Sequence, residues 1–474
     1  MAGEPRRAVA PAVFVVRLAG PEALESSLVA RPDGTDARPF PSLRAALAAA
    51  PDGALLRLGE GEFRERIEIT RPVALVGQGA GRTRLISPDG KGPVIRVHHT
   101  DRVRIEGLSV EGGATGIVFE GGLGHRLEAL SLSGMREAAV VAHETQLIFS
   151  ASEVTNVSGG VRGYGLDVAG GSLELRKVVF RAAGRRAIQI RNASATVEDV
   201  EVERSGLSAL QVLDGAQVRV RGGRFTGMGG AAIYAGGARL SIDGARIGGS
   251  EFGVIAYRGS ELTVIGAEIG GYRVAGVALV NARGAVERCA IAGAGSEAAI
   301  SITGRAGDVP VLLVDNRIRD PGPLGVHITN ASVVARGNSI TGARLDRERD
   351  MGDAFYAVES DLRFEDNVLR GNAGSGIVAV RSRVKLENNG LIENGRSGVL
   401  LVDASRATAA GNFFERNAAA AVEVAEGAHA ALERNRFGQR GSFDIDLGCG
   451  QKAGYADLRT GNTFAAKRRG RACP

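Results

Sequence analysis

The sequence predicts an all-β solenoid, a fold in which short strands are wound into stacked coils. The first observation is a repeat. Asn367, Asn389 and Asn412 stand 22 and 23 residues apart, each at the start of a similar segment, and a fixed period of this length is typical of solenoids. The second is composition, since 44% of the residues are hydrophobic but only 4% are aromatic, with 69 Gly and no Trp among 474 residues. The third is the alternation of apolar and polar residues in short runs such as Leu262–Ile265, which is the pattern of a strand.

The coils can be counted from the first inward residue of each leading strand, and sixteen are found. Most intervals between these residues are 21 to 23 residues, and the longest is 32. The sixteen residues are Val73, Val94, Ile117, Val140, Leu166, Ile188, Leu210, Ile233, Val254, Val277, Ile300, Val326, Val358, Ile377, Val399 and Val422.

One short helix is expected before the coils. In the segment from Pro41 to Gly53, Leu43, Ala46 and Leu47 fall on one face, and a Pro-Asp-Gly turn ends the run. The predicted organisation is a leader or arm at 1–38, a cap with this helix at 39–72, the coils at 73–440 and a C-terminal cap with a basic tail at 441–474.

The segment "PSLRAALAAAPDGALLRLGEGEFRERIEITRPVALVGQG", residues 41–79, resembles the opening of pectin-lyase-like right-handed parallel β-helix proteins, pectinesterases included. In that superfamily a small helix caps the N-terminal end, and a Gly-x-aromatic-x-Glu turn leads into the first coils. The resemblance implies a single-stranded right-handed parallel β-helix of about 16 coils with a short N-terminal capping helix. It also implies an extracellular, periplasmic or cell-surface location, although the sequence shows no clear signal peptide.

The resemblance does not extend to one enzyme family. The paired-Asp segments and the Leu-Gly-Arg-Pro-Trp element of pectinesterases are absent, as are the motif set of polygalacturonases and the Asp-Pro-His-Asp element of β-helix uronate epimerases. Whether the protein is an enzyme therefore stays open. If it is one, a polysaccharide lyase or a glycoside hydrolase is expected.

Composition argues against several other classes. The net charge is +6 and no basic block is interleaved with aromatic residues, so nucleic acid is not an expected partner. No run of 18 apolar residues exists, so no transmembrane segment is expected. Cys449 and Cys473 could pair with each other or remain free thiols. The sequence leaves the oligomeric state open.

No metal or other cofactor is predicted. The sequence contains no His/Cys group with the spacing of a zinc site. A Ca²⁺ site of the pectate lyase kind would need carboxylates on adjacent coils, but Asp167 is followed in its column by Gln189 and Gln211. Calcium therefore has no carboxylate cluster to support it.

A column of Asn residues is predicted to stack inside the turns. Asn tolerates the left-handed backbone of a turn, and its amide can bond the same Asn one coil along. Cys289 falls in the same column, where we interpret it as a small, partly buried turn residue. The column contains Asn316, Asn338, Asn367, Asn389, Asn412, Asn435 and Asn462.

The outward residues of the leading strands form the predicted binding face. Amides, hydroxyls and exposed Tyr rings along one face suit a hydroxyl-rich polymer such as a polysaccharide or a cell-surface glycan, while an ordinary solvated sheet is the alternative. The predicted substrate-binding residues are Asp167, Gln189, Gln211, Tyr234, Tyr257 and Ser301.

The longest coil, from Val326 to Val358, contains a charged insertion that is expected to form a loop, and loops often carry function. A β-elimination lyase needs a base and a cation, which His327 and an Arg could supply. A glycoside hydrolase needs two carboxylates. As a solvated loop the same residues need no catalytic role. The predicted catalytic residues are His327, Glu359, Asp353, Asp361 and Arg347 or Arg349.

Three functional hypotheses result. The first is a β-helix that binds extended polysaccharide along its leading-strand face without catalysis. The second is a divergent polysaccharide lyase or glycoside hydrolase with its site near His327 and residues 342–355. The third is a structural or adhesion scaffold.

Overall fold

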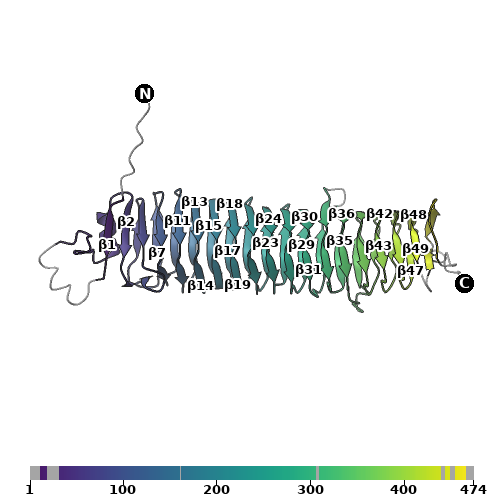
Figure 1. The fold of residues 1–474 in the computed structure, drawn as a ribbon, viewed down its shortest axis with the longest axis horizontal. Helices are drawn as coiled ribbons and strands as arrows, with labels where there is room; N and C mark the ends of the chain where they lie inside the picture. The colour runs from purple at the N-terminus through teal and green to yellow at the C-terminus, as the bar shows by residue number, and fades with distance from the viewer. Residues whose placement is uncertain are drawn as a thin grey trace, which may run out of the picture. The chain divides into compact units, whose positions relative to one another are not determined.

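The computed structural model describes residues 11–18, 31–160, 162–305, 309–438, 443–448 and 454–465. The fold is an all-β solenoid of about 17 turns with one short helix (Figure 1). The chain forms two compact units, residues 1–218 and 219–474. In each unit a turn contributes up to three strands, and strands of successive turns pair in parallel to form three ladders. Cys449, Cys473 and the predicted basic tail lie outside the described residues.

The first unit contains seven strands in its first ladder: β4 (Ile67–Ile69), β7 (Pro93–His98), β10 (Thr115–Glu120), the first parts of β13 (Ala138–Ser150) and β15 (Tyr164–Arg176), β17 (Arg186–Arg191) and β20 (Ser208–Leu213). Its second ladder contains β1 (Val13–Val16), β2 (Ala54–Leu58), β5 (Val73–Val76), β8 (Arg104–Glu106), β11 (His125–Glu128), the second parts of β13 and β15, and β18 (Ser194–Glu198). Its third ladder contains β3 (Gly61–Phe63), β6 (Thr83–Ile86), β9 (Ser109–Glu111), β12 (Ser131–Ser133), β14 (Glu153–Val157), β16 (Val179–Ala183) and β19 (Glu201–Ser205). Strand β21 (Gln217–Arg221) lies at the boundary of the two units.

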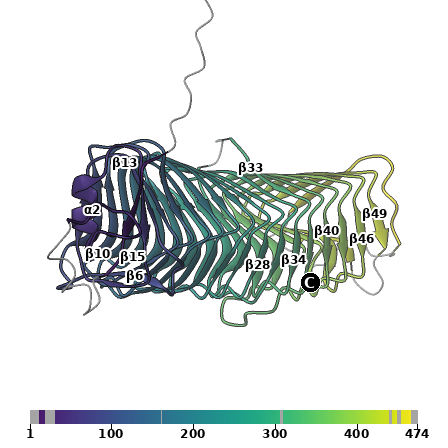
Figure 2. The same cartoon turned by 60° about the vertical axis from the view of Figure 1, so that its left-hand side comes forward.

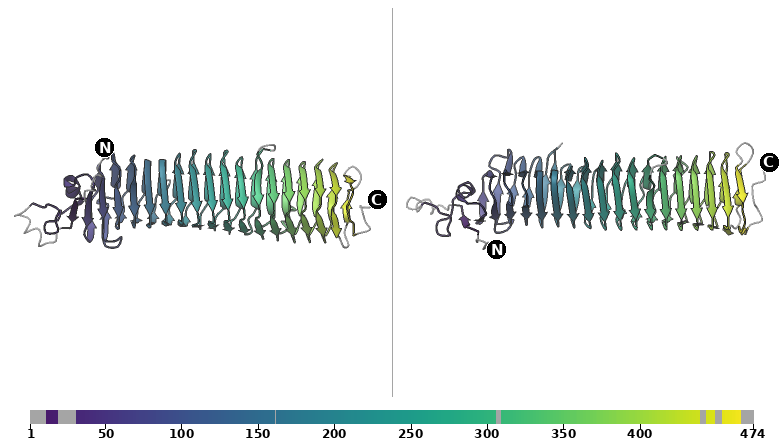
Figure 3. Two further views of the ribbon diagram at one scale, coloured as in Figure 1. Left: turned by 45° about the horizontal axis from the view of Figure 1, so that its top comes forward. Right: turned by 90° about the horizontal axis from the view of Figure 1, so that it is seen from above.

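The second unit repeats this plan (Figure 3). Its first ladder contains β23 (Ala231–Gly236), β26 (Phe252–Tyr257), β29 (Ala275–Val280), β32 (Ala298–Thr303), β35 (Leu324–Thr329), β38 (Asp353–Val358), β41 (Ile377–Val380), β44 (Val399–Val402), β47 (Ala420–Val424) and β50 (Phe443–Asp446). Its second ladder contains β24 (Arg239–Asp243), β27 (Glu261–Ile265), β30 (Arg283–Glu287), β33 (Val311–Val314), β36 (Ser332–Arg336), β39 (Asp361–Glu365), β42 (Arg383–Glu387), β45 (Arg406–Ala410), β48 (His429–Glu433) and β51 (Tyr455–Leu458). Its third ladder contains β22 (Arg224–Thr226), β25 (Arg246–Gly248), β28 (Glu268–Gly270), β31 (Ala290–Ala292), β34 (Arg317–Arg319), β37 (Ser339–Thr341), β40 (Val368–Arg370), β43 (Gly390–Ile392), β46 (Phe413–Glu415) and β49 (Arg436–Gly438).

The core of each unit is built from inward side chains that stack on the same position of the next coil. In the second unit Val254 pairs with Val277, and Val277 pairs with Ile300, and all three are fully buried. Parallel strands are about 4.8 Å apart, so each of these side chains is in contact with the next. Burying an aliphatic side chain of this size stabilises the fold by about 1.5–3 kcal/mol. Period-2 alternation therefore sets which residues face the core and which face outward.

The predicted helix is confirmed as α2 (Leu43–Ala49), which covers the N-terminal end of the coils of the first unit (Figure 2). Ser42 caps it by accepting a hydrogen bond of 3.1 Å from the backbone N–H of Ala45. Strand β1 lies within the predicted arm and pairs with β2, so Val13–Val16 extends the second ladder.

The asparagine ladder is confirmed. Asn367 donates from its backbone N–H (3.0 Å) and from its side chain (2.9 Å) to Oδ1 of Asn389, and Asn389 donates in the same way to Asn412. The backbone N–H of Cys289 donates to Oδ1 of Asn316, so Cys289 occupies the predicted column. A parallel column of Asn372, Asn394 and Asn417 is bonded likewise. The two columns satisfy the backbone groups of turns that are buried from water.

The count of coils needs correction at the N-terminal end. Val73 lies in β5 and pairs with second-ladder strands, whereas Ile67 of β4 pairs with Ile95 of β7. Val94 is buried, but Ile95 is in register with Ile117. Adjacent apolar residues in β7 obscured which one belongs to the column. The fold has about 17 turns where the sequence predicted sixteen.

A second correction concerns the long coil. Val326 pairs with Phe355, and Val358 aligns with Thr329 at the far end of the same strands. The coil is therefore 29 residues long, not 32. The outward residue that stacks on His327 is Tyr356, and Glu359 follows the end of β38.

Candidate functional site

The outward side chains of the first ladder in the second unit, here called the first-ladder face, form the candidate site. Strand pairing fixes their order from coil to coil. The column begins with a Tyr, continues with three aliphatic or small side chains, and then presents an imidazole and a second Tyr before two aliphatic residues and a Glu. The column contains Tyr234, Ile255, Ala278, Ser301, His327, Tyr356, Val378, Leu400 and Glu423.

Two aromatic pairs lie on this face. The ring centroids of Tyr234 and Tyr257 are 5.7 Å apart with a tilt of 32°, and those of His327 and Tyr356 are 5.9 Å apart at 61°. All four side chains are partly exposed. Tyr257 lies in the neighbouring column of the same face. Between the coils of the two pairs, the first column holds Ala278 and Ser301 and the neighbouring column holds Val280 and Thr303, so two large, rigid side-chain groups flank a stretch of smaller ones.

Glu297 links the strands at this point, although no sequence pattern indicated it. It directly precedes β32 and accepts a hydrogen bond of 2.7 Å from Ser301 Oγ. Its Oε1 also lies 3.4 Å from Nδ1 of His327, and His327 Nε2 lies 3.4 Å from Thr329 Oγ1. The bond to His327 is the main reason that the pKa of Glu297 is below its usual value, followed by Ser301 and the charges of His327 and Arg349. The carboxylate is therefore ionised at neutral pH.

The hydroxyl of Ser301 is not hydrogen-bonded to His327, so His327 does not activate it as a nucleophile. Nucleophilic catalysis by serine needs a base within hydrogen-bond reach of the hydroxyl. Here Ser301 donates to Glu297, and His327 lies on the other side of that carboxylate. Ser301 is only 7% exposed.

The charged insertion is confirmed as a loop between β37 and β38 (Figure 2). A backbone bridge between Asp346 and Met351 closes its tip. The guanidinium of Arg349 donates a hydrogen bond of 2.7 Å to the backbone oxygen of Ser296, next to Glu297. Asp350 pairs with Arg396 of a later coil. The loop is thus held against turns on both sides of its own coil, and Arg349 is brought near the candidate site.

Of the predicted catalytic residues, Asp353 is buried and Arg347 is exposed. Asp353 is 3% exposed, and its carboxylate accepts a hydrogen bond of 2.5 Å from the backbone N–H of Ser375. Burial raises its pKa to about 6, against the opposing effect of backbone hydrogen bonds from Ser375 and Gly352. Arg347 is exposed at the tip of the loop and makes no hydrogen bond or ion pair with any residue that the structure describes.

Glu359 and Asp361, two further predicted catalytic residues, lie beyond the end of the first-ladder strand β38. Glu359 is in the turn after β38, with φ of 52°, and pairs with Arg381 at 3.0 Å. Asp361 begins β39 in the second ladder and pairs with Arg383 at 2.6 Å. Because β38 ends at Val358, the chain has already left the first ladder at both positions. The structure shows His327 and Arg349 near each other through Glu297, and each of the predicted carboxylates engaged with other partners.

In the first unit the predicted polar column forms its own network. Asp167 accepts hydrogen bonds from Gln189 (3.0 Å) and Arg191 (3.2 Å). Asp167, Gln189 and Gln211 are 9%, 6% and 8% exposed. Oε1 of Gln211 has no hydrogen-bond partner among the described residues. These side chains support one another and offer little surface to a polymer.

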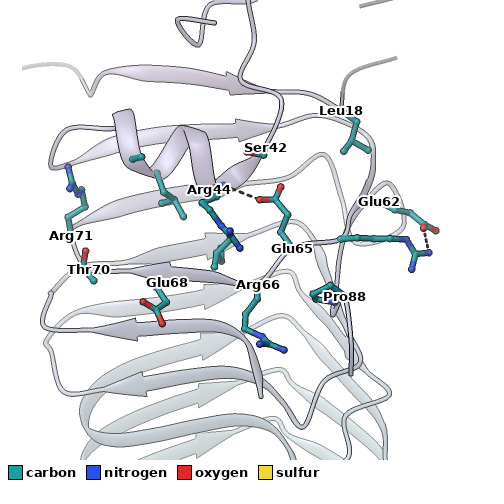
Figure 4. Close-up of a pocket in the computed structure, with 14 residues that line it drawn as sticks. Leu18, Ser42, Arg44, Glu62, Glu65, Arg66, Glu68, Thr70, Arg71 and Pro88 are labelled. Carbon is teal, nitrogen blue, oxygen red and sulfur yellow. Dashed lines mark hydrogen bonds and ion pairs between the residues drawn. The ribbon is translucent and has the colours of Figure 1, made fainter. Parts of the chain in front are cut away.

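The N-terminal cap contains a cavity of about 1100 Å³ lined by charged side chains (Figure 4). Two of its charged side chains form hydrogen bonds with the ends of α2. Glu65 accepts hydrogen bonds from the backbone N–H groups of Leu43 (2.9 Å) and Arg44 (3.1 Å) at the start of α2, and Arg71 donates to the backbone oxygen of Ala50 at its end. An anion at the N-terminus and a cation at the C-terminus are the arrangement that stabilises a helix.

Among the described residues no group of three or more His, Cys, Asp or Glu side chains could hold a metal ion. Across the same part of the chain, no helix has the length and apolarity needed to cross a membrane.

Comparisons with known proteins agree with this architecture. The sequence matches the "Right handed beta helix region" family over residues 186–339 and 275–437. Together the two matches cover residues 186–437, which is more than half of the chain. The chain belongs to the right-handed β-helix family. The handedness implied by the resemblance at residues 41–79 is thereby confirmed.

Several solved structures are similar to this chain at low identity. A mannuronan C-5 epimerase A-module from Azotobacter vinelandii is 14% identical, with 90% of this chain and 95% of that chain covered and a TM-score of 0.24. A pectate lyase, Pel9A, is 12% identical, with 97% and 82% covered and a TM-score of 0.27. Gene product 12 of bacteriophage phi29 is 12% identical, with 82% and 65% covered and a TM-score of 0.39. No curated protein matches the sequence. The function must therefore be argued from the side chains of this chain.

Proposed function

We propose that the first-ladder face of the second unit binds an extended polysaccharide. The observation that carries the proposal is the pair of aromatic groups, Tyr234 with Tyr257 and His327 with Tyr356, on either side of Ala278 and Ser301. From β26 to β38 the face spans four ladder steps, or about 19 Å at ~4.8 Å a step. A linear chain of several sugars is the ligand that fits a row of this length.

The chemistry of the face supports this ligand. Tyr rings offer large apolar area with little conformational freedom to lose, together with a hydroxyl. Thr303 and Thr329 lie beside the column and add hydroxyl groups. Sugars present apolar ring faces and hydroxyl groups in alternation, so the same surface can stack on the rings and bond to the polar groups. The proposal places the protein where polysaccharide is found, at the cell surface or outside the cell.

Binding is tested by probing a glycan array with the full chain and then measuring affinities by calorimetry. Tyr257→Ala and Tyr356→Ala should each weaken binding roughly fivefold, since an aromatic contact contributes about 1 kcal/mol. Tyr455→Ala is the matched control, because Tyr455 is an exposed Tyr of the second ladder. Failure to bind any glycan, or equal affinity of all three variants and the parent, would reject the proposal and favour a scaffold role.

A second candidate function is β-elimination on a uronate polymer, favoured by one observation. His327 lies 3.4 Å from Glu297, and Arg349 is close enough to influence that carboxylate. A base and a nearby cation are the two groups such a reaction needs. The assay is absorbance of the unsaturated uronate product. Activity that disappears in His327→Ala supports a lyase, and activity that persists in this variant rejects the site. Glycoside hydrolysis receives no such support, because Glu359 and Asp361 pair with Arg381 and Arg383 instead of facing a common point.

A further inference from the structure

The turns that precede the first-ladder strands place carboxylates along one side of the face. Phe252, Ala275 and Ala298 are in register, so the residues before them, Glu251, Val274 and Glu297, occupy the same position in three successive coils. Glu297 reaches Ser301 on the face. Glu251 holds the corresponding position two ladder steps away, about 10 Å along the face.

The two carboxylates differ in their partners. Glu297 is engaged by Ser301 and His327, whereas the carboxylate of Glu251 forms no hydrogen bond or ion pair with any residue that the structure describes. The hydroxyls of Tyr234 and Tyr257 likewise form none within the described part of the chain. Three polar groups at one aromatic pair are therefore available to a ligand.

Two carboxylates, Glu251 and Glu297, lie near enough to this pair to act on Tyr257. The pKa of Tyr257 is raised, first by burial and then by Tyr234, Glu251 and Glu297, and no cation opposes the shift. Around the second pair, burial raises the pKa of Tyr356, with Asp353 adding to the shift and Arg381 only partly opposing it.

Three cations near the face already have partners. Arg349 donates to Ser296, and its Nε lies 3.8 Å from Asp346. Arg381 pairs with both Glu359 and Asp403. Arg396 pairs with Asp350 of the loop. Arg273, in the turn between Glu251 and Glu297, donates to the backbone oxygen of Gly229, and the carboxylate of Glu251 has no ion-pair partner among the described residues.

We propose that the first-ladder face selects a polysaccharide with protonated amino groups, and that an ammonium group binds beside the ring of Tyr257 between Glu251 and Glu297. This inference depends on the proposed function and names its ligand class. A cation is attracted to the face of a Tyr ring, and its hydrogen bonds to carboxylates are among the stronger ones in proteins. A uronate polymer would bring like charges together at the same point.

The test compares three sets of oligosaccharides of equal length by calorimetry with the full chain. The probes are glucosamine oligomers, their N-acetylated counterparts and oligogalacturonates, at mildly acidic pH where the amines are protonated. Glu297 stays ionised under these conditions because its pKa is lowered. Glucosamine oligomers should bind best, by about tenfold over the N-acetylated set, and the preference should shrink at high salt.

Glu251→Gln should remove most of this preference and leave the affinity for the N-acetylated oligomers unchanged. Glu268→Gln is the matched control, because Glu268 is an exposed carboxylate of the third ladder that pairs with Arg246. Equal binding of the charged and N-acetylated oligomers, or a preference for oligogalacturonates, would overturn the inference and leave the proposed function standing. Binding of none of the three sets would overturn this inference, and a glycan array without any binding would reject the proposed function as well.

Discussion

The guanidinium of Arg349 donates a hydrogen bond of 2.7 Å to the backbone oxygen of Ser296, 53 residues earlier in the chain. Arg273 makes the same kind of bond, also of 2.7 Å, to the backbone oxygen of Gly229, 44 residues earlier. Each bond passes over an intervening coil, because coils in this unit are about 22 residues long. Arginine is suited to this role, since it carries five donors on a long side chain. In the case of Arg349 the bond also holds a loop.

The first prediction concerns that loop. Arg349→Met should release the loop from the turn at Ser296 and increase the rate of tryptic cleavage at Arg344 and Arg347 severalfold, because proteolysis requires local opening. The thermal midpoint should change little, since the bond is exposed and surface contacts contribute only about 1 kcal/mol or less. Arg347→Met is the control. It also removes one tryptic site, but Arg347 makes no hydrogen bond or ion pair with any described residue, so equal rates of cleavage at Arg344 in the two variants would contradict the tether.

Much of the fold was predictable from the sequence because the signals are periodic. Asn367, Asn389 and Asn412 repeat with the pitch of one coil, and the hydrogen bonds between them are those the spacing implied. The helix within the segment from Pro41 to Gly53 and the inward column from Ile233 to Val326 are likewise as predicted. In each case a residue's role depends on its own chemistry and on neighbours at a fixed interval.

The candidate site was less predictable, because its geometry comes from irregular positions. Val358 is apolar and precedes a polar turn, so it fits the inward pattern of the sequence. The insertion shifts the register, however, and Phe355 takes the inward position. Tyr356 was missed for that reason, although its place between Phe355 and Ala357 in an alternating strand was a usable signal. Glu297 is a turn residue outside any apolar pattern, and only the stacking of coils brings it to His327.

The second prediction follows from the buried carboxyl group of Asp353. Its pKa in the folded protein is about 6, above the ordinary 3.8, because burial disfavours the charged form. Between these values the folded state binds more protons than the unfolded state, so this group lowers the free energy of unfolding as the pH rises from about 4 to about 6. Above pH 6 the loss is complete, and two pKa units correspond to roughly 3 kcal/mol at most.

Asp353→Asn removes the charge and retains an acceptor for the N–H of Ser375. The variant should be more stable than the parent above pH 6, and the difference should vanish near pH 4. Urea denaturation at a series of pH values measures this. Asp243→Asn, at an exposed position in β24, should show no such pH-dependent difference. A destabilised Asp353→Asn at neutral pH would show that the charged form is the one the fold needs.

The third prediction concerns His125 in the first unit and has the opposite sign. His125 is fully buried, its Nδ1 accepts a hydrogen bond of 3.2 Å from the backbone N–H of Val103, and its ring lies 4.9 Å from that of Phe119. Burial lowers its pKa below 6.5. Between the folded pKa and 6.5 the unfolded state binds more protons, so stability falls as the pH is lowered through this range.

His125→Gln should therefore lose less stability than the parent on acidification below pH 6.5, although it is expected to be less stable at neutral pH because the ring packing is lost. The slope of the thermal midpoint against pH is the quantity to compare. His143→Gln, a change at an exposed residue of the same unit, should keep the parent's slope. An unchanged slope in His125→Gln would assign the acid sensitivity to other groups.

The fourth prediction separates the interior of the asparagine ladder from its end. Oδ1 of Asn389 accepts two hydrogen bonds from Asn367, and its Nδ2 donates to the backbone oxygen of Phe364 (3.0 Å) and to Asn412 (2.9 Å). Asn389→Ala leaves buried donors and an acceptor of the neighbouring coils without partners. Each unsatisfied buried group costs about 1–3 kcal/mol, so a loss of about 3 kcal/mol or more is expected in urea denaturation.

Asn462 is the matched position at the C-terminal end of the ladder. It accepts the same two hydrogen bonds, from the backbone and side chain of Asn435, but it is partly exposed. Water can take the place of its amide, so Asn462→Ala should cost about 1 kcal/mol or less. Water can replace the hydrogen bonds of Asn462 but not those of Asn389. Equal losses of stability at the two positions would therefore mean that the ladder contributes through side-chain packing alone.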